Sequence, residues 1–213
     1  EDGGETDGES EGDGEVTYPT NSRKVEALKK EAASLEHQLW HKRKNIFCRF
    51  CMEGKPTYRP ARRKADGTEE THVPVTFGDR VLCDHVVCKR KKDGKTQNVG
   101  LTMLDEASEF TYVFPSKARI ESHVSEAFIF YQGRDKIKEL KSDRAPELSK
   151  AARKAGYSHV KGTPYRSTTM AKIERANRRV IEGCRTLLAA SGLPIQFWGL
   201  AVQCYCMLFN TYC

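Results

Sequence analysis

Three acidic residues lie in settings that suit metal-ion chemistry: Asp84 in FGDRVLCDHV, Asp143 in LKSDRAPEL and Glu174 in TTMAKIERANRR. Asp84 and Asp143 each occur at or near the end of an apolar run typical of a strand, whereas Glu174 occurs near the start of a long basic amphipathic helix. Two strands and one helix can bring such carboxylates together around two Mg²⁺ ions about 3.5–4 Å apart. Ions so placed bind the attacking and leaving oxygens of an in-line displacement, so the predicted substrate is a phosphodiester.

The surroundings of these acids support this hypothesis. Asp84 interrupts an otherwise apolar strand, where a charge is costly without a metal ion or a cation. Asp143 follows a short strand and precedes a helix, which places it at the carboxyl end of that strand, the usual ligand edge of such sheets. Glu174 falls at the border of the buried helical stripe formed by Ile173, Ala176, Val180, Cys184, Leu187 and Leu188. Periodicity alone leaves a second interpretation open, an ordinary helix with surface ion pairs.

A second group of residues has the spacing of zinc ligands. His37 and His41 are four residues apart, so they share one face if this segment is helical, and Cys48 and Cys51 form a CxxC pair. Two imidazoles and two thiolates suit tetrahedral Zn²⁺, and the seven residue steps from His41 to Cys48 can span about 23 Å when extended. With all four positions filled by protein, the predicted zinc site is structural. The alternative is two surface histidines near an unrelated thiol pair.

The charge distribution favours a polyanionic partner. The chain carries a formal charge of +7, yet its first 16 residues contain eight acids and no base, so the remainder is strongly basic. Nucleic acid is the first candidate for such a surface, and a basic surface that is merely solvated is the alternative. The residues expected to contact phosphates are Lys172, Arg175, Arg178 and Arg179 in the helix and Arg62 and Arg63 further upstream.

Composition divides the chain into four predicted parts. Residues 1–20 are Gly-, Glu- and Asp-rich and are expected to form a disordered acidic tail. Residues 21–55 form a helical zinc-binding region, 56–76 a basic linker, and 77–213 a catalytic core that is truncated at its C-terminus. In the second part, an amphipathic stripe predicts a helix that either forms a short coiled-coil seam or packs on a neighbour. Its members are Val25, Leu28, Ala32, Leu35 and Leu39.

From about residue 77 the pattern predicts an α/β domain. Three strands, RVLCDHVV, NVGLTMLD and EFTYVFPS, are joined by the predicted turns RKKDGKTQ and DEAS. A helix follows in ARIESHVSEAFIFYQG, with Ile120, Val124, Ala127 and Phe128 on one face, and then the strand KIKELKSD, the helix APELSKAARKAG and the strand YSHVKG. A helix from about Thr168 to Ser191 stops at GLP, before a final helix. This order predicts a mixed five-stranded sheet flanked by helices.

Other features bound the class of protein. The chain lacks a Met at position 1 and ends inside an apolar run, so we interpret it as a fragment of a longer polyprotein. No signal peptide is present, and the eight cysteines are better explained by buried thiols and one metal-binding pair than by a secreted disulfide framework. The run from Phe197 to Cys213 is short for a membrane span and contains polar residues, so we expect a buried core helix and no membrane partner.

Several blocks of this sequence resemble the integrases of Ty1/copia-type retrotransposons. CRFCMEGKPTYR resembles their zinc-binding region and exit linker, and TPYRSTTMAKIERANRRVIEGCRTLLAASGLPIQFWGLAV resembles the most specific block of their catalytic core. The resemblance covers about residues 37–212. It implies an RNase H-like fold, a metal triad of Asp84, Asp143 and Glu174 that holds Mg²⁺ or Mn²⁺, and Zn²⁺ bound by His37, His41, Cys48 and Cys51. It also implies element and target DNA as partners, a homo-oligomer, and a location in the nucleus.

Three departures from the family pattern leave activity open. Thirty residues separate Asp143 from Glu174 where the family has about 35, Arg144 replaces an Asn, and Met170-Ala171 replaces an Asn-Gly turn. The leading hypothesis is a polynucleotidyl transferase that trims DNA ends and joins them to target DNA. The alternatives are an inactive DNA-binding remnant, as in a decayed copy, an RNase H-like nuclease or cut-and-paste transposase, and a zinc-stabilised interaction protein that dimerises through its Val25–Leu39 helix.

Overall fold

The computed structural model describes residues 22–55, 73–87, 99–162 and 170–212. The predicted acidic tail, most of the basic linker with Arg62 and Arg63, and the predicted turn RKKDGKTQ lie outside these ranges. Within them, helices and strands alternate in the order expected from residue 77 onwards.

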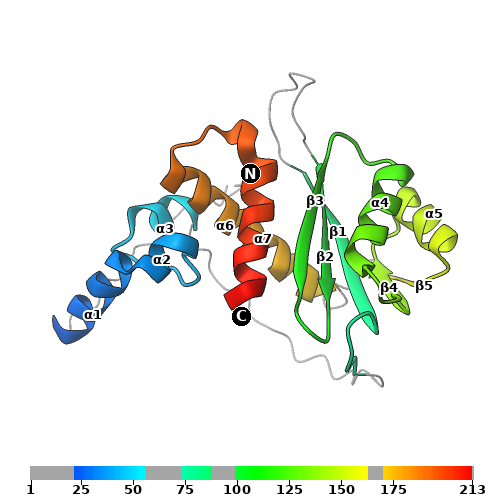
Figure 1. The fold of residues 1–213 in the computed structure, drawn as a ribbon, viewed down its shortest axis with the longest axis horizontal. Helices are drawn as coiled ribbons and strands as arrows, with labels where there is room; N and C mark the ends of the chain where they lie inside the picture. Colours follow the sequence, from blue (N-terminus) through cyan, green and yellow to red (C-terminus); the bar gives the residue numbers. More distant parts are fainter. Residues whose placement is uncertain (1–21, 56–72, 88–98, 163–169, 213) are drawn as a thin grey trace, which may run out of the picture.

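One five-stranded sheet forms the centre of the domain (Figure 1). Its strands are β1 (Arg80–Val87), β2 (Val99–Asp105), β3 (Thr111–Ser116), β4 (Glu139–Ser142) and β5 (Ser158–Lys161), in the order β3-β2-β1-β4-β5. The pairs β1–β2 and β2–β3 are antiparallel, whereas β1–β4 and β4–β5 are parallel. The predicted mixed five-stranded sheet flanked by helices is therefore confirmed.

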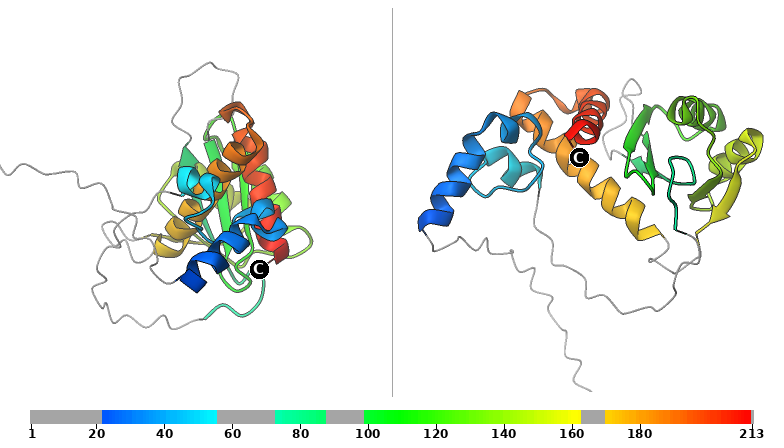
Figure 2. Two further views of the ribbon diagram at one scale, coloured as in Figure 1. Left: turned by 90° about the vertical axis from the view of Figure 1, so that its left-hand side faces the viewer. Right: turned by 60° about the horizontal axis from the view of Figure 1, so that its bottom comes forward.

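Helices cover both faces of this sheet. Helices α4 (Glu121–Gln132) and α5 (Pro146–Ala155) lie on one face, and α6 (Ala171–Ser191) and α7 (Trp198–Tyr212) on the other, with the 3₁₀ turn η2 (Ile195–Phe197) before α7 (Figures 1 and 2). Helix α6 ends at Gly192, whose φ of 66° is a left-handed cap that glycine adopts without strain. The stop predicted at this glycine is found in the structure.

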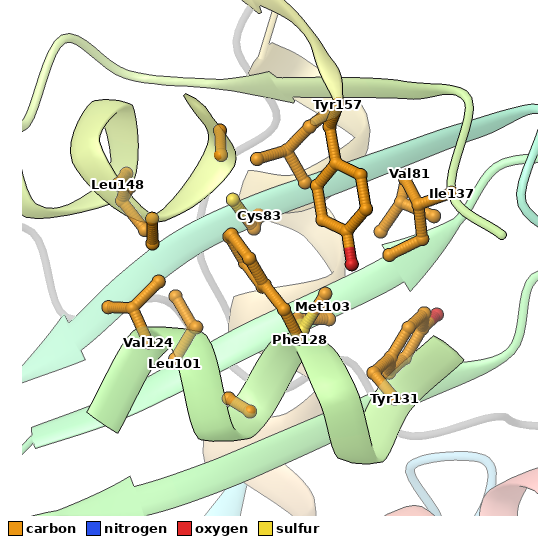
Figure 3. Packing of buried hydrophobic residues seen from close by; sticks show 14 residues of the cluster. Val81, Cys83, Leu101, Met103, Val124, Phe128, Tyr131, Ile137, Leu148 and Tyr157 are labelled. Carbon is orange, nitrogen blue, oxygen red and sulfur yellow. The ribbon is translucent and has the colours of Figure 1, made fainter. Parts of the chain in front are cut away.

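Successive side chains of β1 point to opposite faces of the sheet, so one face carries core residues and the other carries a site residue. Val81 and Cys83 point into the cluster beneath α4 and α5, where Phe128 and Leu148 are fully buried (Figure 3). Leu82, between them, packs on the other face against α6. Because side chains alternate along a strand, Asp84 also faces α6. The apolar pattern of one strand thus anchors the sheet on one side and presents a carboxylate on the other.

The N-terminal region contains three short helices, and it differs from the single predicted stripe. They are α1 (Ser22–Ala33), α2 (Leu35–Trp40) and α3 (Arg49–Gly54). The helix breaks at Ser34, whose hydroxyl accepts a hydrogen bond from the His37 amide and so caps α2. Leu35 and Leu39 are exposed, so the predicted continuous stripe is wrong at its C-terminal end.

Helix α3 packs closely on α6, and Gly54 makes this contact. A Cβ at position 54 would lie 2.8 Å from the Thr186 nitrogen and 2.9 Å from its Cα. We expect Gly54→Ala to destabilise the protein by about 1–3 kcal/mol, because backbone rather than a flexible side chain would have to move. Urea unfolding measures this cost. The matched control is Glu53→Ala, which removes only an exposed ion pair with Arg49, and an equal loss in both variants would contradict the prediction.

One expectation about burial is wrong: Ile120 precedes α4 rather than lying on its buried face, and it is 44% exposed. Helix α7 is a core helix as predicted, because Tyr205, Cys206 and Phe209 are buried in a core cluster, although Leu200 and Met207 are exposed. Within the described ranges, no helix combines the length and the apolar character that a membrane span requires.

Helix α7 also reaches the free edge of the sheet. Strand β3 is an edge strand, and the Asn210 side chain accepts a hydrogen bond from the Thr111 amide at 3.1 Å and donates one to the Thr111 carbonyl at 2.9 Å. The amide group therefore satisfies both backbone groups that a further strand would otherwise pair.

Candidate metal centre and carboxylate site

The four predicted zinc ligands converge in one buried cluster. The ligand atoms of His37, His41, Cys48 and Cys51 all lie within 4.8 Å of one another. The Cys48 Sγ is 3.4 Å from His41 Nδ1, and the Cys51 Sγ is 3.5 Å from both His37 Nε2 and His41 Nδ1. A tetrahedral zinc ion with Zn–S of about 2.3 Å and Zn–N of about 2.0–2.1 Å separates sulfur from nitrogen by about 3.6 Å. The donor types and their spacing therefore fit such an ion.

The backbone around His41 explains how the two histidines converge. His41 lies just past α2, with φ 49° and ψ 40°, rather than on the same helical face as His37 as predicted. Burial lowers the pKa of His41 to about 4, with smaller effects from His37 and Lys55. The neutral imidazole is the form that binds metals. The buried Lys55 donates to the carbonyl oxygens of His41 and Lys42, so it caps the end of α2 instead of facing solvent.

Two of the three predicted catalytic carboxylates lie on neighbouring parallel strands. The register pairs Cys83 of β1 with Ser142 of β4, and Asp84 and Asp143 each follow by one residue. Asp143 Oδ1 accepts the Ala145 amide at 3.1 Å, which fixes the carboxylate at the start of the turn into α5. The β1–β4 pairing therefore brings Asp84 and Asp143 to the same edge of the sheet.

The negative charges of Asp84 and Asp143 act on each other. Burial raises the pKa of Asp84, and the negative charge of Asp143 raises it further. Hydrogen bonds from the His85 amide and from Asn177, and the charge of Arg119, act in the opposite direction. A carboxylate that burial and a like charge disfavour is one that a divalent cation would stabilise. The sequence analysis noted Arg144 beside Asp143 and missed Arg119.

Glu174 is placed by the first turns of α6. It is exposed, and three residues later Asn177 Nδ2 donates to Asp84 Oδ2 at 2.8 Å. Residues three apart on a helix lie on one face, so Glu174 is on the same side of α6 as the residue that binds Asp84. Asn177 was not predicted as a site residue. Its signal was its position on the polar border of the helix, one turn after Glu174.

The side chains of Asp84, Asp143 and Glu174 do not form a group that could share one ion. In the described part of the chain, the one group of three or more His, Cys, Asp or Glu residues close enough to share an ion is the HHCC cluster. The structure brings Asp84 and Asp143 to one edge of the sheet and sets Glu174 one helical turn from Asn177, which contacts Asp84. Met170, just before α6, packs near Gly162 at the end of β5, so the start of the helix lies over the same edge of the sheet.

The basic residues of α6 fall into two groups. Arg175 and Arg178 are exposed. Lys172 is about half exposed and pairs with Glu106, and Arg179 lies with its guanidinium 4.0 Å from the centre of the Phe209 ring and 3.3 Å from Thr111 Oγ1. The position of Arg179 differs from the expectation that it faces a polyanion, because the helix turns this residue toward α7 and β3.

Asp105 and His85 have structural partners in the fold. The buried carboxylate of Asp105 accepts hydrogen bonds from the Gly78 amide and from the amide and hydroxyl of Ser108. His85 points away from Asp84, to the opposite face of the sheet, where its Nδ1 is 3.7 Å from Glu147. All six described cysteines are free, and Cys204 alone among them is exposed.

The strand order 3-2-1-4-5, with three antiparallel strands followed by two parallel ones, defines an RNase H-like fold, here preceded by an HHCC segment. Its homologues are retrotransposon Pol polyproteins. The chain is 31% identical over 172 residues to the retrovirus-related Pol polyprotein from transposon TNT 1-94 of Nicotiana tabacum, a match that covers 76% of this chain and 12% of that protein. It is 29% identical over 122 residues to the transposon Ty1-DR4 Gag-Pol polyprotein of Saccharomyces cerevisiae, covering 52% of this chain and 8% of that protein.

Solved structures are similar as well. The crystal structure of the catalytic core domain of BIV integrase matches with a TM-score of 0.48 and 16% identity, over 64% of this chain and 86% of that chain. No protein-family model matches the sequence. The resemblance to retrotransposon Pol polyproteins stated from the sequence is confirmed by the two relatives.

Proposed function

We propose that this chain is the integrase segment of a retrotransposon Pol polyprotein, a polynucleotidyl transferase that trims element DNA ends and joins them to target DNA. The observation that carries the proposal is the convergence of Asp84, Asp143 and the Asn177 turn of α6 at one edge of an RNase H-like sheet. Homology to Pol polyproteins supports it.

Each residue has a defined role in this proposal. Asp84, Asp143 and Glu174 would hold Mg²⁺ or Mn²⁺, which supplies activation of an attacking water or 3′-hydroxyl and charge neutralisation at the leaving oxygen. Asp84 and Asp143 provide the fixed ligands, because a sheet positions both. Asn177 orients the Asp84 carboxylate through its amide. Glu174 would complete the ligand set from the first turn of α6.

The zinc region has a supporting role. Zn²⁺ held by His37, His41, Cys48 and Cys51 would tie α2 to α3, which packs on α6 through Gly54. Because α6 also carries Glu174, the zinc region packs on the helix that supplies the third carboxylate.

The test is a DNA cleavage and joining assay. The protein is mixed with a labelled duplex that ends like the element DNA, an unlabelled target and Mg²⁺ or Mn²⁺. We expect nicking near the 3′ end and transfer of the labelled strand into the target. Metal-dependent products that persist unchanged in both Asp84→Asn and Asp143→Asn variants would contradict the proposal.

Asn177→Leu should lower nicking about 10- to 100-fold with little change in DNA affinity. The substitution keeps the size of the side chain but removes the donor to Asp84, and small errors in the position of a catalytic group are costly. Single-turnover rates with saturating DNA measure the effect. The matched control is Asn210→Leu, which removes two hydrogen bonds to the Thr111 backbone and none to a carboxylate. Equal rates per folded molecule in both variants would remove Asn177 from the site.

A DNA-binding remnant without catalysis is the second candidate. Two observations favour it: Glu174 is exposed, and the three carboxylates do not form a group, among the described residues, that could share an ion. This alternative predicts DNA binding that depends on salt but no products with either metal ion. The same assay therefore separates the two functions.

The proposed partners follow from the exposed bases. Arg175 and Arg178, together with Arg62 and Arg63, would contact DNA phosphates, which gives binding that weakens with salt and has little base specificity. Action at both ends of an element would require more than one copy of the chain, and joining to chromosomal DNA would place it in the nucleus.

A further inference from the structure

We infer that Glu106 is a positioning residue: it holds the first turn of α6 on the sheet and thereby sets the location of Glu174. This inference rests on the proposed function for its catalytic consequence. Its structural part concerns only a buried ion-pair network and the helix that the network holds.

The network joins four elements through one buried carboxylate. Glu106 lies in the turn after β2, and its side chain is only 4% exposed. Its Oε1 pairs with Lys172 of α6, and its Oε2 lies 3.4 Å from Arg80 Nη1 of β1. Arg80 Nε in turn lies 2.5 Å from Glu139 Oε1 of β4. Both oxygens of Glu106 are therefore committed to cations.

A backbone hydrogen bond also holds Glu106 in place. The Glu106 amide donates to the Arg80 carbonyl at 3.0 Å, so the turn is fastened to the beginning of β1. A buried carboxylate is costly unless cations and hydrogen bonds compensate for its lost hydration. This cost makes the Arg80 and Lys172 contacts specific rather than incidental, in contrast to ion pairs on an open surface.

Glu174 lies between two polar tethers. Lys172, two residues before it, is tied to Glu106, and Asn177, three residues after it, is tied to Asp84. Between these tethers, Ile173 and Ala176 pack on Leu82 and Leu104. The helix begins at Met170 without a side-chain cap, so its first turn lacks the usual local stabilisation. The Lys172–Glu106 pair supplies an anchor at this uncapped end.

A different role for Lys172 makes the opposite prediction. Its side chain is 53% exposed, and the sequence analysis assigned it to DNA phosphates. If it acts as a phosphate contact, Lys172→Met weakens DNA binding and lowers the salt dependence by about 0.9 in the log–log slope. If it acts as an anchor, the same variant lowers the single-turnover rate about tenfold or more and leaves DNA affinity unchanged.

The experiment compares Lys172→Met, Glu106→Gln and the double variant. Lys172→Met keeps the Arg80–Glu106 pair, so it tests the anchor even if Glu106→Gln folds poorly. The matched control is Lys154→Met, which breaks an exposed ion pair with Glu121 between α4 and α5. We expect the two single changes to lower nicking by similar factors and the double variant to be no worse than either.

Hydrogen exchange decides the structural part independently of catalysis. We expect the amides of Ile173 to Ala176 to exchange about tenfold faster in Lys172→Met, with no change in β1 or α4. Unchanged exchange in the first turn of α6, or a weaker DNA affinity with an unchanged rate, would overturn the inference. A wild-type protein without nicking activity would instead contradict the proposed function, and exchange would still decide whether Glu106 anchors the helix.

Discussion

Asp84→Asn should lower metal-dependent nicking and joining by about 10³-fold or more while leaving the protein at least as stable as the wild type. The lost activity corresponds to about 4 kcal/mol of transition-state stabilisation, a magnitude expected when a metal loses a fixed ligand. The stability follows from electrostatics. Because burial and Asp143 raise the pKa of Asp84, its charged form disfavours the metal-free fold, and a neutral amide removes this cost.

Asp79→Asn is a control for which we expect the opposite change in stability. Asp79 binds Lys138 at 2.6 Å and accepts the Val75 and Thr76 amides, and these contacts hold the pKa of its carboxyl well below the usual range. Its charged form favours the fold, so the amide should lower stability and leave turnover unchanged. Rates and urea midpoints measured on both variants check the pair. If Asp84→Asn lost stability and kept activity, Asp84 would be a structural residue.

Loss of the HHCC centre should have the second largest effect. Cys51→Ala, or removal of zinc with a chelator, should destabilise the protein by several kcal/mol, because structural zinc sites contribute directly to folding. Cys51 is completely buried and contacts both histidines, so no other group can take its place. The expected result is a lower unfolding midpoint, with residues 35–55 the first to become protease-sensitive.

Zinc content gives this prediction a direct readout. The wild type should contain one zinc per chain, and Co²⁺ in its place should give the absorption of a tetrahedral thiolate complex. The matched control is Cys204→Ala, because Cys204 is an exposed free thiol outside the cluster. A Cys51→Ala variant that kept full zinc content and stability would contradict the assignment.

Local patterns in the sequence were sufficient to predict the elements of the core. The apolar, β-branched run at Arg80–Val87 and the 3.6-residue period of Ala171–Ser191 both correspond to elements of the structure. The HHCC spacing predicted four residues that do converge. Periodicity and ligand spacing are properties of short stretches of the sequence, so these features can be predicted without knowledge of tertiary contacts.

Tertiary contacts account for what could not be predicted. Three residues interact with partners that are distant in the sequence: Asn177, Arg119 and Glu106. No periodic pattern in the sequence identifies those partners. Arg179 belongs to the same basic run as Arg178, yet α7 covers it with Phe209. The break at Ser34 has a local signal, a serine that can cap a helix, but the stripe pattern across it concealed the break.

The contact between Asn210 and Thr111 has a consequence for solubility. An edge strand with unused amides and carbonyls is a template on which a strand of another molecule can add, and repeated addition leads to fibrils. Here a single carboxamide occupies the first such position on β3. Shortening the polypeptide before Phe209 would strip this protection together with an aromatic ring, so the shortened form should precipitate through intermolecular β-pairing even where its central layers remain folded.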